Sequence, residues 1–387
     1  MRVGVFLGSN VPNAGGTFSF EDNIFNALLE VNSRHEFYVF YYGKREVCPR
    51  EAVHLISLSS PLTKLKRAIG IRTFLRIFKA IKKVSMGLEY EEGSSLQNAV
   101  AKHDIEFMWF LGHAFEEVKI PFAVTVLDLA HRVTPFFPEV SVTGNLWGAR
   151  ENHFSSIIPR AAYSISSTKA GKHEIVKFYQ VQDERVRVIP FPVPSFVYQK
   201  KDTEINLANR FGIPSPYLFY PAQFWPHKNH IGILYALKIL QDNYKLDFCL
   251  VFCGSDKGNA KYVEKKARDL GLEHKVHFLG FVSTDEMIAL YKNAFAMIFA
   301  SFFGPDNLPP LEAFALGCPV VASEVAGANE QMGDAAILFD PKNERAMALA
   351  IKQLVDDPEL RGDLVSRGLA AASWTAEDYI KCIVDMV

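Results

Sequence analysis

The sequence has few cysteines, and none of them is spaced for a disulfide framework or a metal site. Its 387 residues include five cysteines, without a Cys-x-x-Cys pair or a Cys/His cluster. Four of the five lie in apolar segments, which is typical of small buried thiols. This pattern argues against a disulfide-rich secreted domain and predicts a reducing, cytoplasmic compartment.

A strong charge of either sign and a long hydrophobic run are also missing. Lysine and arginine number 42 against 43 acidic residues, and the net charge of −1 argues against nucleic-acid binding. No apolar run reaches the ~18 residues that a membrane span needs. The first ten residues, MRVGVFLGSN, become polar too quickly for a signal peptide and predict a first strand instead.

What the sequence does contain is an alternation of short apolar runs with helical patterns. With 387 residues, of which 49% are apolar, the chain is long enough for two well-packed domains. Near-continuous apolar strands separated by helices are typical of parallel sheets covered on both faces. We therefore predict an α/β fold with two doubly wound, Rossmann-like parallel sheets. The expected strands span residues 2–8, 36–42, 105–111, 122–128, 162–166, 186–191, 217–223, 248–254, 276–281, 296–301, 319–323 and 335–340.

A proline-rich segment, residues 190–204, predicts the boundary between the two domains, because its prolines break both strand and helix patterns. We place an N-terminal domain at residues 1–194 and a C-terminal domain at residues 195–371. Ligands of doubly wound sheets bind beyond the carboxyl ends of the strands. The predicted binding site is therefore the cleft between the two domains.

The stretch FFGPDNLPPLEAFALGCPVVAS, residues 302–323, places one acid in an apolar helix. Pro310 suits a first helical turn, so Glu312 is expected in that turn, and Gly317 suits the helix end. Backbone N–H groups at this helix start would bind an anion such as a diphosphate, with Glu312 on ribose hydroxyls. Alternatively, Glu312 merely complements the helix dipole. The residues alone do not separate these two roles.

The same stretch carries a resemblance to a known family. NLPPLEAFALGCPVVAS resembles the signature of family-four retaining glycosyltransferases, which have the GT-B fold and move a sugar from a nucleotide-sugar donor to an acceptor. The resemblance extends over nearly the whole chain. Further matching segments, in the family's order, are NAGGTFSFEDNIFNAL, DLAHRVTPFFPEVS, FYPAQFWPHKNH, VHFLGFVS and GDAAILFDP. It also implies that the last helix, within residues 372–387, packs back on the N-terminal domain.

The resemblance places the donor along the loop and helix that contain Asp306, Asn307, Leu308 and Glu312. Glu312 matches the family's second glutamate, which contacts the donor ribose. The family's first glutamate lies eight residues earlier, and this chain has Gly304 there. Asp306 is the nearby acid that could substitute for it, and its alternative role is that of a turn residue.

The segment QFWPHKNH contains a lysine expected at the donor diphosphate. Lys228 matches the family's lysine at this place, and its alternative role is that of a solvated loop lysine. The family usually has an arginine where this chain has Gln223, a neutral donor without the bidentate fork. A protonated His227 would supply part of the missing charge, and a structural role is its alternative.

Two further segments are expected around the donor. Gly15 and Gly16 let the backbone approach a ligand closely, and in the family such a pair faces the donor phosphate and sugar. The alternative is an ordinary glycine turn. Phe281 and Val282 match the family loop that holds the nucleobase, mostly through backbone groups.

The segment TVLDLAHR offers candidate catalytic residues at a strand end. Asp128 could orient an acceptor hydroxyl or act as its base. Many relatives carry His-Asp here, but this chain has Leu127 in place of that histidine. His131 is a second catalytic candidate, and its alternative is a structural contact with Glu139 or Asp128. Glu151 is expected to be a solvated helix residue.

A basic stretch, residues 64–84, has eight lysines and arginines and no acid, with apolar residues at roughly helical spacing. Such a helix would lie on an anionic membrane, with the protein peripheral on the inner face of the plasma membrane. The alternative is a surface helix that packs on the first sheet.

Taken with the resemblance, these residues predict a retaining hexosyltransferase that moves a sugar from UDP-glucose to a saccharide or lipid-linked acceptor in cell-envelope polysaccharide biosynthesis. No Asp-x-Asp pair is present, and the resemblance implies no cofactor and no metal, with the nucleotide sugar as co-substrate. A GDP-mannose-dependent mannosyltransferase and a non-catalytic nucleotide-sugar binder are the alternatives. A phosphorylase or a hexosamine epimerase of the same fold would be further rivals.

Overall fold

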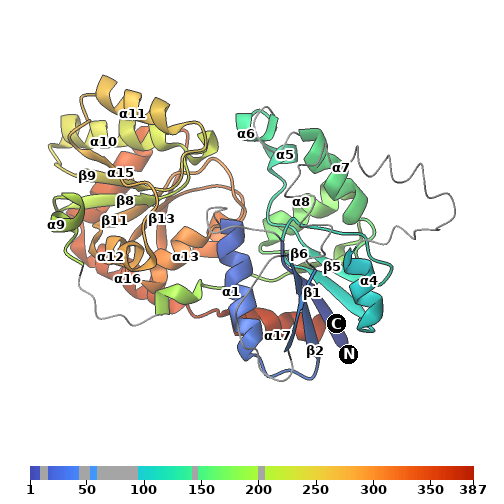
Figure 1. Ribbon diagram of the computed structural model, residues 1–387. Coiled ribbons are helices and arrows are strands. Elements are labelled where there is room, and N and C mark those ends of the chain that lie inside the picture. Colours follow the sequence, from blue (N-terminus) through green and yellow to red (C-terminus); the bar gives the residue numbers. More distant parts are fainter. Residues whose placement is uncertain (9–15, 43–52, 59–94, 142–146, 199–204) are drawn as a thin grey trace, which may run out of the picture.

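The computed structural model describes residues 1–8, 16–42, 53–58, 95–141, 147–198 and 205–387. These residues form two α/β units, each built on a parallel sheet (Figure 1). This confirms the predicted fold class. Residues 64–84 of the basic stretch, and Gly15, lie outside the described residues. Among the residues described, no helix is both long enough and apolar enough to cross a membrane.

The first sheet has the strand order β3-β2-β1-β4-β5-β6-β7, and every neighbouring pair in it is parallel. Strand order reverses between β1 and β4, which makes this the switch point where doubly wound sheets bind ligands. Its strands are β1 Arg2–Phe6, β2 Glu36–Tyr41, β3 Val53–Ser57, β4 Phe107–Phe110, β5 Phe122–Thr125, β6 Tyr163–Ser166 and β7 Val186–Val188.

Successive side chains of each strand point to opposite sides of this sheet, and helices cover both faces. Val5 and Trp109 face the core that includes helices α1 and α17, whereas Phe6, Met108 and Phe110 face the core under α4, α7 and α8. The helices of this half are α1 Gly16–Glu30, α4 Ser95–Lys102, α5 Ala130–Val133, α6 Pro138–Ser141, α7 Trp147–Ile157 and α8 Lys169–Tyr179, with the short 3₁₀ helix η2 at Asp183–Arg185.

The second sheet has the strand order β10-β9-β8-β11-β12-β13, again with parallel pairs only. Its switch point lies between β8 and β11. The strands are β8 Tyr217–Pro221, β9 Cys249–Cys253, β10 Val276–Phe278, β11 Ala296–Phe299, β12 Val320–Ser323 and β13 Ala336–Phe339. The helices are α9 Leu207–Phe211, α10 His230–Tyr244, α11 Ala260–Asp269, α12 Thr284–Asn293, α13 Leu308–Ala315, α14 Ala328–Met332, α15 Glu344–Asp356, α16 Pro358–Ala371 and α17 Ala376–Met386, with the 3₁₀ turns η3 Ser195–Tyr198 and η4 Pro226–Lys228.

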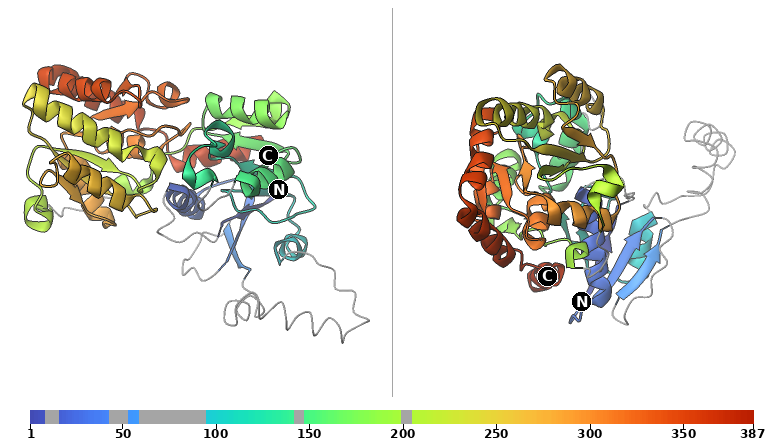
Figure 2. Two further views of the ribbon diagram at one scale, coloured as in Figure 1. Left: turned by 90° about the horizontal axis from the view of Figure 1, so that it is seen from above. Right: turned by 90° about the vertical axis from the view of Figure 1, so that its left-hand side faces the viewer.

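The chain crosses between the two units twice. After α16 it returns to the first sheet, where α17 lies against α1 (Figures 1 and 2). Tyr379 of α17 is fully buried there, with its ring 5.6 Å from that of Phe20 and 6.1 Å from that of Trp109. The two crossings are tied together, since Val193 N–H donates to Trp374 O at 3.0 Å and the Trp374 indole donates to Pro190 O at 2.9 Å.

Two details of the fold differ from the sequence prediction. Strand β3 was not expected, because VHLIS has a histidine inside it and is only partly buried, as suits a strand at the sheet edge. Helix α13 begins at Leu308, so Pro310 lies in its first turn as predicted, whereas Glu312 does not. Glu312 is therefore the fifth residue of the helix, beyond its first turn.

Candidate active site

A cleft of about 580 Å³ lies between the two units, at the carboxyl ends of both sheets. Gly16 and Thr17, at the start of α1, follow β1 and line it from one side. Lys228 and Asp306 line it from the other, after β8 and β11, which flank the second switch point. The cleft therefore joins the ligand-binding edges of two doubly wound sheets.

Lys228 places a cation in this cleft. Its Nζ lies 5.1 Å from the centre of the Phe299 ring, and no described residue forms an ion pair with it. Burial lowers the pKa of Lys228 to about 8, although the charges of Asp128 and Glu139 favour the protonated form. A partly dehydrated ammonium without a fixed counter-ion is suited to binding an anionic ligand.

The start of α13 offers fewer N–H donors than the sequence suggested. Residues 309 and 310 are prolines and have no N–H, and Asn307 N–H already donates to Gln331 Oε1 at 3.1 Å. Leu308 therefore carries the one N–H at this helix start that has no partner among the described residues. Binding of an anion here would therefore depend more on Lys228 than on the N–H groups of the helix.

Glu312 lies in the cleft wall, and its carboxylate is nearly buried. Burial raises its pKa to about 7, while the hydrogen bond that Tyr291 Oη donates to Oε2 at 2.7 Å acts in the opposite direction. Tyr291 fixes one carboxylate oxygen. Because Glu312 lies beyond the first helical turn, the alternative that it merely complements the helix dipole loses its basis.

Asp306 is engaged by the protein itself. Its Oδ2 accepts from Phe191 N–H at 3.2 Å, across the junction of the two units, and its Oδ1 accepts from Gln331 Nε2. Burial raises the pKa of Asp306 to about 7. Asp306 lines the cleft, but its carboxylate is already held by partners on both oxygens.

Gln223 is likewise held by neighbours. Its Nε2 donates to Ser255 Oγ at 3.1 Å, and its Oε1 accepts from Trp225 Nε1 at 3.0 Å. The residue lines the cleft but adds no charge to it.

His227 does not supply the charge either, which corrects that part of the prediction. Burial lowers its pKa to about 4, so the imidazole is neutral near pH 7. Its Nδ1–H donates to Glu139 Oε1, and its ring stacks on that of Phe303 with centroids 4.3 Å apart.

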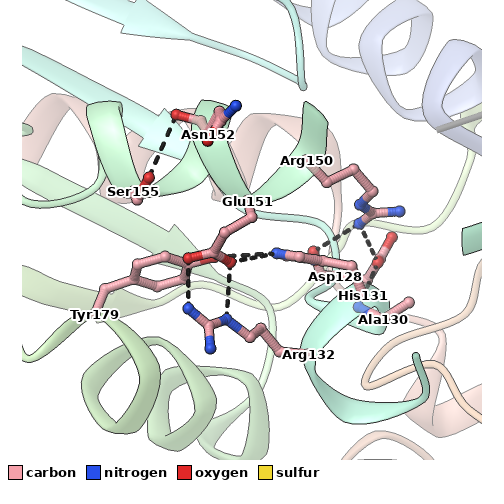
Figure 3. Close-up of polar contacts among 9 residues, drawn as sticks. All are labelled: Asp128, Ala130, His131, Arg132, Arg150, Glu151, Asn152, Ser155 and Tyr179. Atoms are coloured by element: carbon pink, nitrogen blue, oxygen red, sulfur yellow. Dashed lines mark hydrogen bonds and ion pairs between the residues drawn. The ribbon is translucent and has the colours of Figure 1, made fainter. Parts of the chain in front are cut away.

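On the N-terminal side of the cleft, Asp128 pairs with Arg150 of α7 (Figure 3). Burial would raise the pKa of Asp128, but Arg150 and the other donors around the carboxylate hold it at about 2. Its Oδ1 also accepts from Ala130 N–H at 2.9 Å. A carboxylate with so low a pKa is a weak base, so the geometry favours orientation of an acceptor hydroxyl over proton abstraction.

His131 is fully buried and is not among the residues that line the cleft, so its catalytic assignment was wrong. Its Nε2 lies 3.2 Å from Glu151 Oε2 and 3.2 Å from Tyr179 Oη (Figure 3). Arg132 adds a two-pronged ion pair to Glu151. Glu151 is therefore a network residue that joins α5, α7 and α8, and not the solvated residue that we expected. The structural partners of His131 are neither Glu139 nor Asp128.

The remaining predicted residues that the structure describes also line the cleft. Gly16 lines the cleft at the start of α1, and Asn307 and Leu308 line it at the start of α13. Phe281 and Val282 line it after β10, where Phe281 is 72% exposed.

Several cleft residues were not found from the sequence. Arg150, Glu139, Lys257 and His113 all line the cleft. His113 carried a usable signal, since a polar residue three positions after a buried parallel strand lies at the ligand-binding edge. The others come from helices or loops whose orientation depends on tertiary packing. Among the described residues, no group of three or more His, Cys, Asp or Glu is placed to hold a metal ion.

Comparison with known proteins matches the second unit to the kind of family that the sequence motifs indicated. Residues 204–370 match the sequence profile of the family described as "Glycosyl transferases group 1". The O-antigen chain mannosyltransferase RfbU of Salmonella typhimurium is 29% identical over 52% of this chain and 53% of its own length. The O-antigen chain mannosyltransferase B of Escherichia coli is 32% identical over 41% of this chain and 42% of its own. The chain thus spans about half the length of these relatives.

Solved structures match over the whole chain. WaaG, described as a glycosyltransferase involved in lipopolysaccharide biosynthesis, is superposed with a TM-score of 0.68 at 17% identity, covering 100% of this chain and 99% of WaaG. Alr3699/HepE of Anabaena, solved with UDP and glucose, gives 0.70 at 16% identity, with 100% and 99% covered. At such identities the likeness establishes the fold alone. The chain therefore has the GT-B fold, and its residues 204–370 match the profile of the group 1 glycosyltransferases.

Proposed function

We propose that the protein is a retaining hexosyltransferase that transfers a sugar from a nucleotide diphosphate donor to a saccharide or lipid-linked acceptor of the cell envelope. The observation that carries the proposal is the cation of Lys228 in the interdomain cleft, without a carboxylate partner among the described residues. The family match of the second unit and the O-antigen enzymes among the relatives support it.

In the proposed complex the donor lies along the second sheet. Lys228 and the Leu308 N–H bind the diphosphate, Glu312 accepts a hydrogen bond from the ribose, and the backbone at Phe281 and Val282 holds the base. Tyr291 leaves one oxygen of Glu312 for this contact. Asp128, on the opposite wall, orients the acceptor hydroxyl.

The reaction needs stabilisation of the departing nucleotide more than it needs a strong base. The bond between the anomeric carbon and the phosphate oxygen breaks, and its electron pair goes to the phosphate, where Lys228 offsets the growing charge. The acceptor oxygen bonds to the anomeric carbon from the same face, and its proton passes to the leaving phosphate oxygen. Asp128, with its pKa held at about 2, need not accept that proton.

Two donors remain to be tested. The sequence resemblance favours UDP-glucose, whereas both O-antigen relatives are named as mannosyltransferases, which favours a mannose donor such as GDP-mannose. We propose no metal requirement, and a titration of activity against EDTA and Mg²⁺ tests this point.

The experiment is a transfer assay with each donor and a panel of envelope-type saccharide acceptors, read by nucleotide release and by mass spectrometry of the product. A product one hexose heavier, with the donor's anomeric configuration in its NMR spectrum, is expected. Lys228→Met should release nucleotide at least tenfold more slowly, whereas Lys238→Met, on the exposed side of α10, should match the wild type. Nucleotide binding without release from any donor would identify a non-catalytic binder instead.

A further inference from the structure

Glu139 reaches the cleft from the opposite unit, on the short helix α6. It lines the cavity although Lys228 and the other side chains expected at the donor belong to the second sheet. Its side chain is only 8% exposed. A carboxylate that enters a binding cavity from across a domain junction calls for an explanation, because burying it costs free energy unless it is paired.

One oxygen of Glu139 is fully occupied. Oε1 accepts from both the backbone N–H of His227, at 3.1 Å, and the ring Nδ1–H of the same residue. Because a carboxylate oxygen has two acceptor sites, this oxygen is saturated. An aromatic cluster holds the arrangement, with the Phe137 ring 5.8 Å from that of Phe302 and Phe303 stacked on His227.

The other oxygen has no partner. Oε2 is shielded from water and has no hydrogen-bond partner among the described residues, and the residue's own backbone N–H is the one further donor that acts on this carboxylate. The hydrogen bond from His227 keeps the pKa of Glu139 below its ordinary value even though burial acts to raise it, so the group is ionised and can only accept. Buried polar atoms in folded proteins nearly always have a partner, and an orphaned carboxylate oxygen in a cavity wall points to a donor on the ligand.

The position of Glu139 indicates which part of the ligand supplies that donor. His227 binds Glu139, and the next residue along the chain is Lys228, the proposed diphosphate ligand. Glu139 accepts from the backbone N–H adjacent to Lys228 in sequence, whereas Glu312 lies on the separate helix α13. The hexose is joined directly to the diphosphate, so its ring must lie beside Lys228, on the side away from the ribose.

We propose that Glu139 binds one hydroxyl of the donor hexose and is a specificity-determining residue for the sugar. The inference rests on the proposed function, and it adds a side chain of the N-terminal unit to recognition of the donor sugar. One hydroxyl is bound rather than a vicinal pair, because Oε1 is already saturated. The contact also requires the two units to be together, so sugar recognition depends on the closed cleft.

The test compares a nucleoside diphosphate with its hexose conjugate by calorimetry, using whichever of UDP/UDP-glucose and GDP/GDP-mannose binds the wild type. Glu139→Gln keeps the shape and an acceptor for His227 but replaces the free acceptor by an amide donor. We expect about 10- to 100-fold weaker binding of the conjugate and a change below about twofold for the nucleoside diphosphate. The matched control is Glu330→Gln, which alters another carboxylate at the domain junction, on Lys169 N–H, away from the cleft.

Equal losses for both ligands, or no loss for the conjugate, would overturn the inference and leave the proposed function standing. Failure of every nucleotide to bind the wild type would remove the proposed function and the inference with it. A second measurement needs no variant: conjugates that lack one hexose hydroxyl at a time are titrated into the wild type. Removal of one particular hydroxyl should weaken binding to the wild type about tenfold or more, and the same removal should have no effect on binding to Glu139→Gln. A wild type indifferent to every hydroxyl would refute the proposal even if the variant failed to fold.

Discussion

Diphosphate binding should weaken at alkaline pH, because the cation in the cleft is a lysine with a lowered pKa. Burial brings the pKa of Lys228 to about 8 from the ordinary 10.5. At pH 9 only about one molecule in ten then carries the charge, so a ligand that requires it should bind about tenfold more weakly than at pH 7. This equals a loss of about 1.4 kcal/mol.

The assay is a calorimetric titration of UDP or GDP at half-unit steps between pH 7 and pH 9.5. Lys228→Arg is the matched control, because a guanidinium stays protonated over this range and the nucleotide itself titrates in the same way in both proteins. We expect a decline that begins near pH 8 in the wild type and a shallower profile in the variant. Parallel profiles would refute the assignment of Lys228 as the diphosphate ligand.

Lys228 should also affect the pH dependence of folding stability, in the direction opposite to that of a lysine in an ordinary ion pair. Its folded-state pKa lies below its unfolded value, so the unfolded chain binds more protons between about pH 8 and 10.5, and stability rises with pH in that window. Lys228→Met should therefore not unfold the protein at pH 7. Loss of nucleotide binding in this variant can then be attributed to the missing charge rather than to a damaged fold.

Three further predictions concern stability. Glu312→Gln should raise the melting temperature at pH 8 but not at pH 5. The reason is that burial raises the pKa of Glu312 to about 7, so that ionising this buried carboxyl costs up to ~3 kcal/mol above that pH. An equal effect of the substitution at the two pH values would contradict this prediction. Gly304→Glu, which restores the family's acid, should destabilise the loop, because φ is +139° there, in a region that is essentially restricted to glycine. The control Gly362→Ala, in α16, should be harmless. An unchanged melting temperature for Gly304→Glu would refute this prediction. Stability should fall between pH 6.5 and 4 as the buried His227, whose folded pKa is about 4, takes up a proton on unfolding, and His227→Gln should flatten that part of the urea-derived profile.

The fold was readable from the sequence because its strands are buried on both faces. Segments such as FCLVFC and AMIFA have no polar face, and a continuous apolar run of that length between helices has few other structures available. The strand that was missed, β3, is partly exposed at the sheet edge and contains His54, so its pattern carries little signal.

The composition of the site was readable only in part. Residues that follow a strand at the carboxyl edge, such as Asp128, Lys228 and Asp306, could be located because the strand fixes their place. Their partners could not. Glu139 meets His227 across 88 residues and Asp306 meets Phe191 across 115, and both contacts depend on how two separately folded units pack together.

The electrostatic states of the site residues also required the structure. His227 was one candidate for supplying positive charge but is neutral, and Asp128 was a candidate base but has a pKa of about 2. Burial and neighbouring charges decide both, and neither is encoded by a residue's identity or local sequence. His131 failed as a catalytic candidate for the same reason, because its partners come from α7 and α8.

The most direct test of the central claim is a thermal-shift panel with UDP, GDP, ADP and their hexose conjugates on the wild type and Lys228→Met. We expect the nucleoside diphosphate of one base, alone and as its hexose conjugate, to raise the melting temperature of the wild type and to have much less effect on the variant. No shift with any nucleotide, or equal shifts in the two proteins, would contradict the claim that this cleft binds a nucleotide sugar through Lys228.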